Sequence, residues 1–288
     1  MEFRTFRPSD YLLLCDFLIE LNQSNRTHIN WNWARFEWMY YHPEFNKSEQ
    51  HRIGFWLEGE HLVGLAIYDM YFGEANCLVL PGYETLYPEV VEYAWKELRD
   101  ENGLGIAING QDGKSIATLK GMGFALAEQR ESILSAQLDH RFDDALPDGF
   151  SYAELDPAKE PYEFQWLLYQ GFDHGDDKAS FEKEIVQIPR NRDHFDLTLS
   201  LSIITESGEK VAYCCLWFDP RTDYAYLEPL CVVPAYRGRG LGTSLVHRLF
   251  NIAHGIGTKT TYVISDQAFY YNAGFAKNEQ YTFFWKHA

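Results

Sequence analysis

Hydrophobic residues in the second half of the chain follow two different spacings in succession. The run from Leu227 to Val233 is short, apolar and β-branched, which predicts a buried strand that ends at Pro234. Beyond it, apolar residues have the three- and four-residue spacing of a helix with one buried face, at positions 241, 245, 246, 249, 250 and 253. This stretch is therefore expected to form a strand, a turn and an amphipathic helix.

The first half of the chain carries a similar pattern at a nearly constant distance. The helical spacing recurs at positions 86, 90, 91, 94, 95 and 98, each 155 residues earlier. Leu80-Pro81 precedes Val233-Pro234 by 153 residues. Gly123-Phe124 precedes Gly274-Phe275 by 151 residues. Three landmarks in the same order and at similar distances predict a tandem duplication.

Each half is expected to run strand, two helices, three strands, helix, strand, helix and strand. Strands are predicted at residues 3–7, 53–57, 62–68, 77–80, 106–108 and 132–138, and again at 150–155, 197–205, 210–217, 224–233, 260–264 and 279–285. The stretch from Asp139 to Gly149 is polar and rich in turn residues. We therefore predict one domain at residues 1–142 and a second at residues 143–288.

Composition and charge exclude several classes of protein and several kinds of binding partner. The length of 288 residues fits two domains of about 140 residues each. The five cysteines lie in apolar contexts without a Cys-x-x-Cys pair, so we expect a reduced, cytoplasmic protein with no metal site. No apolar run approaches the ~18 residues of a membrane helix. The formal net charge of −17 counts against nucleic acid and membranes as partners.

The turn between the predicted strand and helix carries the clearest chemical signal. The segment from Arg237 to Thr243 contains three glycines and two arginines. Glycines let the backbone approach a ligand, and the unpaired amides of a helix start bind anions such as pyrophosphate. The Lys-Ser/Thr ending of a P-loop and the Gly-x-Gly-x-x-Gly spacing of a dinucleotide site are both missing.

What remains is Arg237-x-x-Gly240-x-Gly242 after Val232-x-Pro234, which resembles the acyl-CoA pyrophosphate loop of the GNAT N-acetyltransferase superfamily. The two-copy layout is similar to mycothiol synthase and its relatives. The resemblance implies an α/β (α+β) protein of two tandem GNAT-like domains, each a mixed, mostly antiparallel twisted sheet flanked by helices. It also implies that acetyl-CoA is bound by Cys231, Val232, Val233, Arg237, Gly238, Arg239, Gly240, Leu241, Gly242 and Thr243.

A second motif points to the catalytic residues. Phe269-Tyr270-x-x-x-Gly274-Phe275 resembles the superfamily's aromatic-Tyr-x-x-x-Gly-Phe segment, which makes Tyr270 the proton donor to the departing thiolate and Tyr271 the alternative. A phenol has a pKa of ~10, comparable to that of a thiolate. Glu228 is the expected base for the acceptor amine, directly or through water, although an ion-paired structural role is equally open. Many relatives carry an asparagine where this chain has Val263.

The first half lacks both features. Its loop reads Glu84-Thr85-Leu86-Tyr87 and is followed by Pro88, so a carboxylate replaces the arginine and one amide donor is missing. Leu119 stands at the spacing of Tyr270. We therefore predict that the first domain is a degenerate GNAT-like domain without a cofactor loop.

The resemblance implies an acyl-CoA-dependent N-acyltransferase that transfers acetyl to a primary amine by direct attack. A small-molecule acceptor is expected, and the acidic residues between Gly171 and Asp177 either hold its cationic amine or form an ordinary surface loop. Two alternatives are a non-catalytic acyl-CoA-binding sensor and an aminoacyl transferase of the tandem GNAT-like type. The acidic charge counts against the latter. The acceptor, the acyl length and the oligomeric state stay open.

Overall fold

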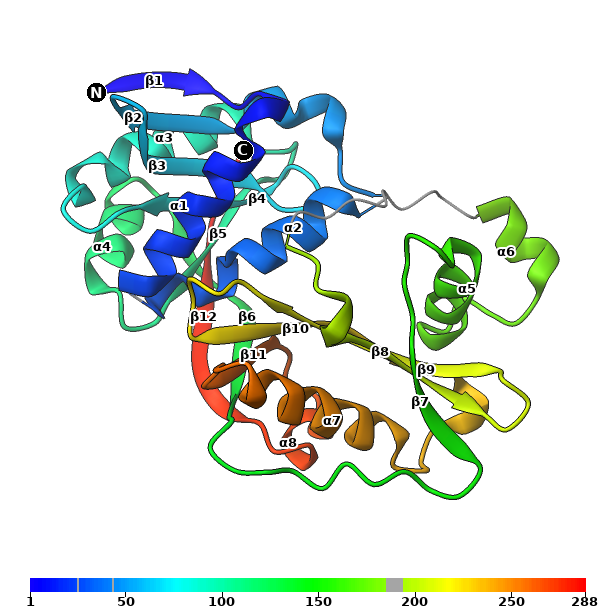
Figure 1. The fold of residues 1–288 in the computed structure, drawn as a ribbon. Coiled ribbons are helices and arrows are strands. Elements are labelled where there is room, and N and C mark those ends of the chain that lie inside the picture. The colour runs from blue at the N-terminus through cyan, green and yellow to red at the C-terminus, as the bar shows by residue number, and fades with distance from the viewer. Residues whose placement is uncertain (25, 43, 185–193) are drawn as a thin grey trace. The chain divides into compact units, whose positions relative to one another are not determined.

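The computed structural model describes residues 1–288 except 25, 43 and 185–193 (Figure 1). The chain packs into two units, residues 1–133 with 278–288, and residues 134–277. Among the described residues, no helix combines the length and hydropathy that crossing a bilayer requires.

The first unit is a sheet with helices on its faces. Its elements are β1 (Glu2–Thr5), α1 (Tyr11–Ser24), α2 (Trp33–Tyr41), β2 (Gly54–Glu58), β3 (His61–Tyr68), β4 (Glu74–Val79), α3 (Tyr87–Glu97), β5 (Gly103–Asn109), α4 (Gly113–Gly121) and β6 (Ala125–Gln137). The strand order is β1-β2-β3-β4-β5. These strands pair antiparallel except β4 and β5, which are parallel.

The second unit repeats this arrangement. Its elements are β7 (Phe150–Glu154), α5 (Pro161–Gly171), α6 (Lys178–Glu184), β8 (Ser200–Thr205), β9 (Lys210–Phe218), β10 (Tyr224–Val232), α7 (Leu241–Gly255), β11 (Thr260–Ile264) and α8 (Ala268–Asn272), after which the chain continues into β12 (Ala276–His287). The order is β7-β8-β9-β10-β11, and only β10 and β11 are parallel. The predicted fold class, mixed and mostly antiparallel sheets flanked by helices, is confirmed.

The helical spacing found in the sequence marks the faces that pack on the sheets. On α7, all six positions are buried, and the helix packs on β8, β9 and β10. On α3, Val90, Val91, Ala94 and Leu98 are buried against β3 and β4. Leu86 and Trp95 are half-buried. Burying such a stripe is the main source of stability for helices of this length.

The last strand of each half differs from the expectation. We expected residues 279–285 to close the second half, but β12 pairs antiparallel with β5 of the first unit, from Tyr281 opposite Asn109 to His287 opposite Gly103. Likewise, the end of β6 belongs to the second unit, where Leu138 N–H donates to the Lys259 carbonyl at 2.8 Å. The packing units thus exchange their closing strands. The sequence boundary at residues 142 and 143 divides the two repeats along the chain and stays a prediction.

Glycines on β5 make room for this pairing. A Cβ atom on Gly105 would lie 2.5 Å from the Trp285 ring, and one on Gly103 would lie 2.0 Å from the Lys286 carbonyl oxygen. Both distances are shorter than van der Waals contact, so larger residues would push β12 away from β5.

Candidate functional site

The two parallel strands of the second unit separate after a few residues. β10 and β11 pair only where Tyr224 to Tyr226 lie beside Thr260 to Tyr262. A bulge then interrupts β10 between Leu227 and Leu230, and the Glu228–Pro229 peptide bond in it is cis. Trp217 Nε1 donates to the Glu228 carbonyl at 2.6 Å and holds the bulge in place. Beyond it, the β11 side of β10 has no strand partner among the described strands.

The backbone of this open edge can be assigned from its pairing on the other side. Val233 N–H donates to the Val211 carbonyl at 2.9 Å, so it faces β9. Peptide groups alternate in direction along a strand, and those of Leu230 and Val232 therefore face the open side. The Val232 carbonyl on that side accepts from Arg237 Nε at 2.9 Å. An extended ligand could pair with the remaining groups as an added strand.

The open edge leads directly to the glycine-rich turn. Gly238 and Gly240 have φ of 76° and 81°, the left-handed region that glycine adopts without strain. Gly240 is the N-cap of α7, and the first bond of the helix runs from Ser244 N–H to the Gly240 carbonyl at 3.0 Å. The amides of residues 241–243 consequently have no acceptor within the helix. Together with the helix dipole they form an anion-binding site.

Gly242 keeps this helix start close to its neighbours. A Cβ atom there would lie 3.1 Å from the Phe269 ring and 3.5 Å from Val232 Cγ2. The glycine therefore lets the first turn of α7 pack between β10 and α8. The same contact connects the turn with the helix that carries Tyr270.

The two arginines of the turn already have protein partners. Arg237 Nη2 donates to the Gly171 carbonyl at 2.8 Å and pairs with Asp173 at 3.0 Å, which ties the turn to the end of α5. Arg239 stacks on the Tyr236 ring at 5.3 Å and donates to the Ala235 carbonyl at 3.3 Å. Both side chains are exposed. The sequence indicated phosphate ligands but did not reveal this structural role of Arg237.

The acidic loop after α5 is largely engaged in local contacts. Asp173, which itself has a φ of 64°, pairs with Arg237. Asp177 accepts from Ser180 N–H at 2.9 Å near the start of α6. These contacts favour the interpretation of a surface loop over that of an amine-binding cluster.

Tyr270 lies on α8 and is half-buried. Its ring packs edge-on against Phe269 at 5.2 Å and Phe275 at 5.6 Å. Burial raises the pKa of Tyr270 well above its usual value, and the negative charge of Glu228 and ionisation of Cys214 raise it further. The phenol therefore stays protonated at neutral pH and can act as an acid. Tyr271 is 44% exposed and lies on the solvent side of the short helix.

Glu228 is half-buried on the bulge of β10. Its charge acts on Tyr270, so a carboxylate and a phenol occupy neighbouring space beside the open edge. Pro229 after Glu228, inside a strand pattern, was the sequence signal for this bulge, because a proline within a strand marks a bulge or an edge. We had not drawn that conclusion from the sequence.

The cysteines of this region are packing residues. Cys231 is buried, and burial raises the pKa of its thiol to about 12. A Cβ atom on Gly171 would lie 2.5 Å from Cys231 Sγ, so the end of α5 packs directly on β10. A protonated, enclosed thiol is a poor nucleophile. Val263, at the position where relatives carry asparagine, is also buried.

The first unit has the same strand geometry but a different turn. β4 and β5 pair only through Glu74 and Ala75 before they separate. Glu84 Oε1 accepts from Gly82 N–H at 3.2 Å, so a carboxylate satisfies an amide of the turn. Pro88 stands in the first turn of α3, and Leu119 is buried in α4.

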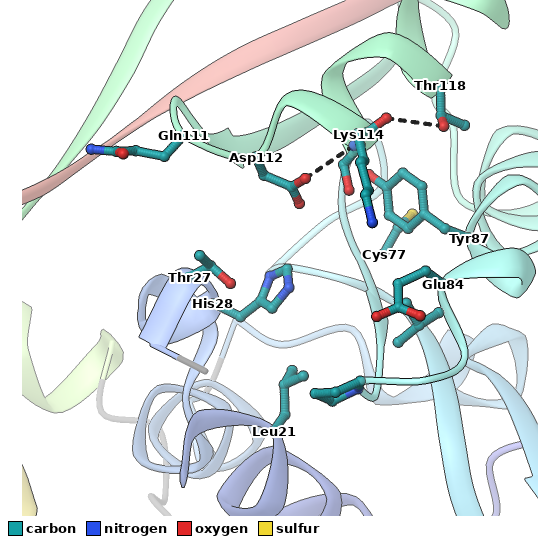
Figure 2. A pocket seen from close by; sticks show the side chains of 13 residues that line it. Leu21, Thr27, His28, Cys77, Glu84, Tyr87, Gln111, Asp112, Lys114 and Thr118 are labelled. Carbon is teal, nitrogen blue, oxygen red and sulfur yellow. Dashed lines mark hydrogen bonds between the residues drawn. The ribbon is translucent and has the colours of Figure 1, made fainter. Parts of the chain in front are cut away.

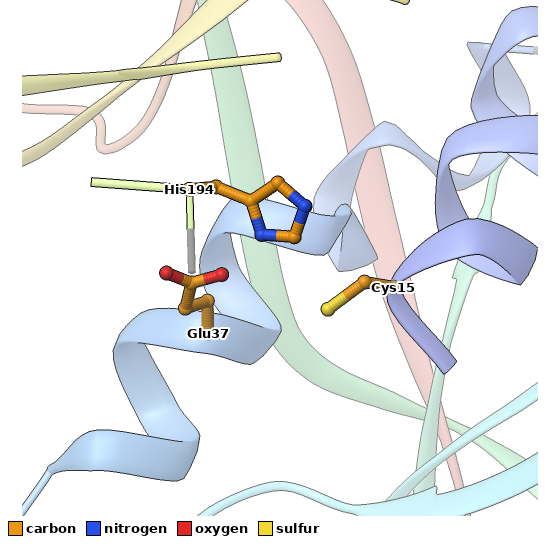
Figure 3. Close-up of side chains that lie close together, drawn as sticks. All are labelled: Cys15, Glu37 and His194. Carbon is orange, nitrogen blue, oxygen red and sulfur yellow. The ribbon is translucent and has the colours of Figure 1, made fainter. Parts of the chain in front are cut away.

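Two residues of types that can bind metal ions lie on helices α1 and α2 of the first unit. Figure 3 shows Cys15 on α1 and Glu37 on α2, both buried. His194, drawn with them, belongs to the second unit and lies 3.4 Å from Asp219 there. Two ligands within one unit are fewer than a structural zinc site uses, and we assign no metal to them.

Comparison with known proteins agrees with this geometry. Residues 158–275 match the model of the acetyltransferase (GNAT) family. A tandem GNAT protein from the clavulanic acid biosynthesis pathway has 15% identity and a TM-score of 0.62, covering 99% of this chain and 98% of its own. A GCN5-related N-acetyltransferase from Sphaerobacter thermophilus has 13% identity and a TM-score of 0.58, covering 99% and 95%. A GNAT acetyltransferase from Colwellia psychrerythraea has 12% identity and a TM-score of 0.59, covering 99% of both chains. No curated protein matches the sequence.

The matched segment lies within the second unit and includes the open strand edge, the glycine turn and α8. This unit therefore carries an acetyltransferase domain. Over its whole length, the chain has the fold of a tandem GNAT protein.

Proposed function

We propose that the second unit is an acyl-CoA-dependent N-acyltransferase that transfers acetyl from acetyl-CoA to a primary amine of a small acceptor. The observation that carries this proposal is the open edge of β10, which runs from Glu228 straight to three unpaired amides at the start of α7. An extended arm with a diphosphate at one end matches both parts of this surface. Bound acetyl-CoA would supply the activated acetyl group.

For the cofactor we propose the same residues that the sequence predicts. The backbone of Cys231, Val232 and Val233 would lie beside the extended arm. The diphosphate would be held by residues 237–243, with amides from 241–243 and the exposed guanidinium groups of both arginines. Arg237 Nη2 already binds Asp173 and the Gly171 carbonyl. A diphosphate would therefore compete with these two contacts for the guanidinium group.

Glu228 and Tyr270 would move the protons. An alkyl ammonium with a pKa of ~10.4 must lose a proton before its nitrogen attacks, and Glu228 would accept that proton directly or through a water. When the tetrahedral intermediate collapses, the carbon–sulfur bond breaks and Tyr270 would donate its proton to the thiolate. The Tyr270 phenol carries this proton at neutral pH, as a phenol with the usual pKa of ~10 also does.

The five cysteines are free and buried, which supports a reducing compartment such as the cytoplasm. The Glu84 carboxylate on a turn amide and Pro88 in the first turn of α3 support the role of the first unit as a scaffold without its own cofactor loop.

The direct test combines calorimetry with acetyl-CoA and an assay of thiol release with a panel of primary amines. We expect binding, and turnover with at least one small amine. Absence of acetyl-CoA binding would refute the proposal. Binding without thiol release across the panel would favour the acyl-CoA sensor instead. Arg237→Glu should weaken binding, whereas Glu101→Gln on an exposed loop of the first unit should not.

A further inference from the structure

The first unit contains a cavity of about 300 Å³ where β4 and β5 separate (Figure 2). Its polar wall includes His28, Glu84, Tyr87, Asp112 and Lys114. This volume is at the lower end of the range for small-molecule sites, so it suits a compact ligand rather than a nucleotide.

The fold builds this cavity from four separate segments. β4 supplies Cys77 and Val79, the turn after it supplies Glu84, and the residues around the start of α4 supply Asp112 and Lys114. His28 closes it from the segment between α1 and α2. Figure 2 shows His28 and Asp112 facing each other across the space. Residues from four segments converge without filling the volume.

Tyr87 provides an unsatisfied polar atom in the wall. Its side chain is 5% exposed, and its hydroxyl is buried without a hydrogen-bond partner of normal geometry among the described residues. Burial raises the pKa of Tyr87, and the nearby Ser115 hydroxyl acts in the opposite direction. An unpaired buried hydroxyl is unfavourable, because it has lost its hydrogen bonds to water. A ligand in the cavity that bonded to it would recover this free energy.

The charges around the cavity favour a cation. Asp112 Oδ1 accepts from Ser115 N–H at 3.0 Å as the N-cap of α4, and its charge also acts on His28 and Tyr87. Glu84 adds a second carboxylate, and Lys114 supplies the one formal positive charge among the lining side chains. Burial lowers the pKa of His28 to about 4, so it is neutral at pH 7. The lining therefore carries one excess negative charge.

The apolar part of the lining is formed by Leu21, Cys77, Val79 and Pro81. We propose that this cavity of the first unit binds a small primary amine, with its ammonium at Asp112, a hydrogen bond to the Tyr87 hydroxyl, and its carbon chain on the apolar part of the lining. This site lies entirely within the first unit and does not depend on cofactor binding by the second.

The test uses the full chain and three probes of the same length, n-butylamine, butan-1-ol and butyrate, with affinities from saturation-transfer NMR titrations. We expect butylamine to bind about ten-fold more tightly than the alcohol, because charge-assisted hydrogen bonds are stronger than neutral ones. Equal affinity for amine and alcohol, or a preference for butyrate, would overturn the proposal.

Two variants locate the binding. Asp112→Asn preserves the N-cap of α4, since asparagine caps as well as aspartate, and should weaken butylamine binding about ten-fold. Tyr87→Phe preserves the ring and should weaken it about three-fold or more. Glu101→Gln removes an acid that does not line the cavity and should bind as the unaltered chain does. If Asp112→Asn and Tyr87→Phe, folded by circular dichroism, keep full affinity, the amine binds elsewhere and the proposal is wrong.

Discussion

The starts of α7 and α3 are two versions of one strand, turn and helix. In both units a pair of parallel strands separates after two or three residue pairs, and the helix after the first of these strands begins beside the opening. In the second unit, glycines with positive φ leave three helix amides available to an anion. In the first, Glu84 accepts from a turn amide and Pro88 removes another donor. A few side chains in one scaffold thus leave helix amides available in one unit and occupy or remove them in the other.

The helices that follow the second parallel strand of each unit, α8 and α4, differ at the position expected to carry the catalytic acid. α8 carries Tyr270, whose phenol is kept protonated next to Glu228. α4 carries Leu119, which is fully buried in the core. We therefore expect an anion site and an acid in the second unit alone, whereas the first unit encloses a small polar cavity.

The largest effect is expected from removing the acid that only the second unit has. Tyr270→Phe should lower kcat about 10²- to 10⁴-fold with little change in acetyl-CoA affinity, because proton donation is lost while the ring packing stays. Steady-state kinetics and calorimetry measure the two quantities. Tyr271→Phe is the matched control on the same helix and should retain turnover. A Tyr270→Phe variant with undiminished kcat would remove Tyr270 from the role.

The exchanged strand can be tested by crowding its pairing with β5. Gly105→Leu should lower the free energy of unfolding by about 1–3 kcal/mol, because a side chain there collides with the Trp285 ring. Amide exchange should increase first in β5 and β12. Gly113→Leu, in open space at the start of α4, is the control for a larger residue in the same unit. Faster exchange in β8 to β10, with β12 unaffected, would contradict the assignment of β12 to the first unit.

Substituting one glycine in each turn tests which of the two turns contributes to acetyl-CoA binding. Gly240→Val forces a branched residue into the left-handed region, at a cost of about 1–2 kcal/mol, and should weaken acetyl-CoA binding about ten-fold. Gly82→Val creates a similar strain at φ of 92° in the first unit, also with open space around it. Calorimetry should find unchanged affinity for that variant. Equal losses in both variants would mean that the two turns do not differ in cofactor binding.

The last effect concerns pH and the cavity of the first unit. The pKa of His28 is lowered from 6.5 to about 4, so the unfolded chain takes up a proton that the folded chain does not. Stability from this difference is present above pH 6.5 and is lost as the pH falls toward 4. Between pH 7 and pH 4.5, His28→Gln should reduce the loss in the free energy of unfolding by about 2 kcal/mol, measured by urea unfolding at both pH values. His254→Gln, an exposed residue of α7, should retain the full pH dependence, and an identical profile for His28→Gln would exclude this role.

Local patterns predicted much of the fold. The helical spacing of apolar residues at positions 241–253, and its copy at positions 86–98, identified both amphipathic helices. One buried face imposes a fixed period on the sequence of a helix. The glycine turn was also readable, since left-handed backbone and unpaired amides depend on residues next to each other. The roles of Tyr270 and Glu228 came from the family resemblance, and they stay predictions.

Other features depended on contacts between distant residues. Nothing in the pattern of residues 279–285 says which strand it joins, because any exposed edge satisfies the same alternation of side chains. The link of Arg237 to Asp173 and Gly171 joins residues more than sixty positions apart. The cavity of the first unit collects side chains from four segments, and its excess charge exists only once they surround one space. Periodicity and turn chemistry are local and were determined by the sequence itself, whereas strand partners, ion pairs and cavities are long-range and were decided by the tertiary structure.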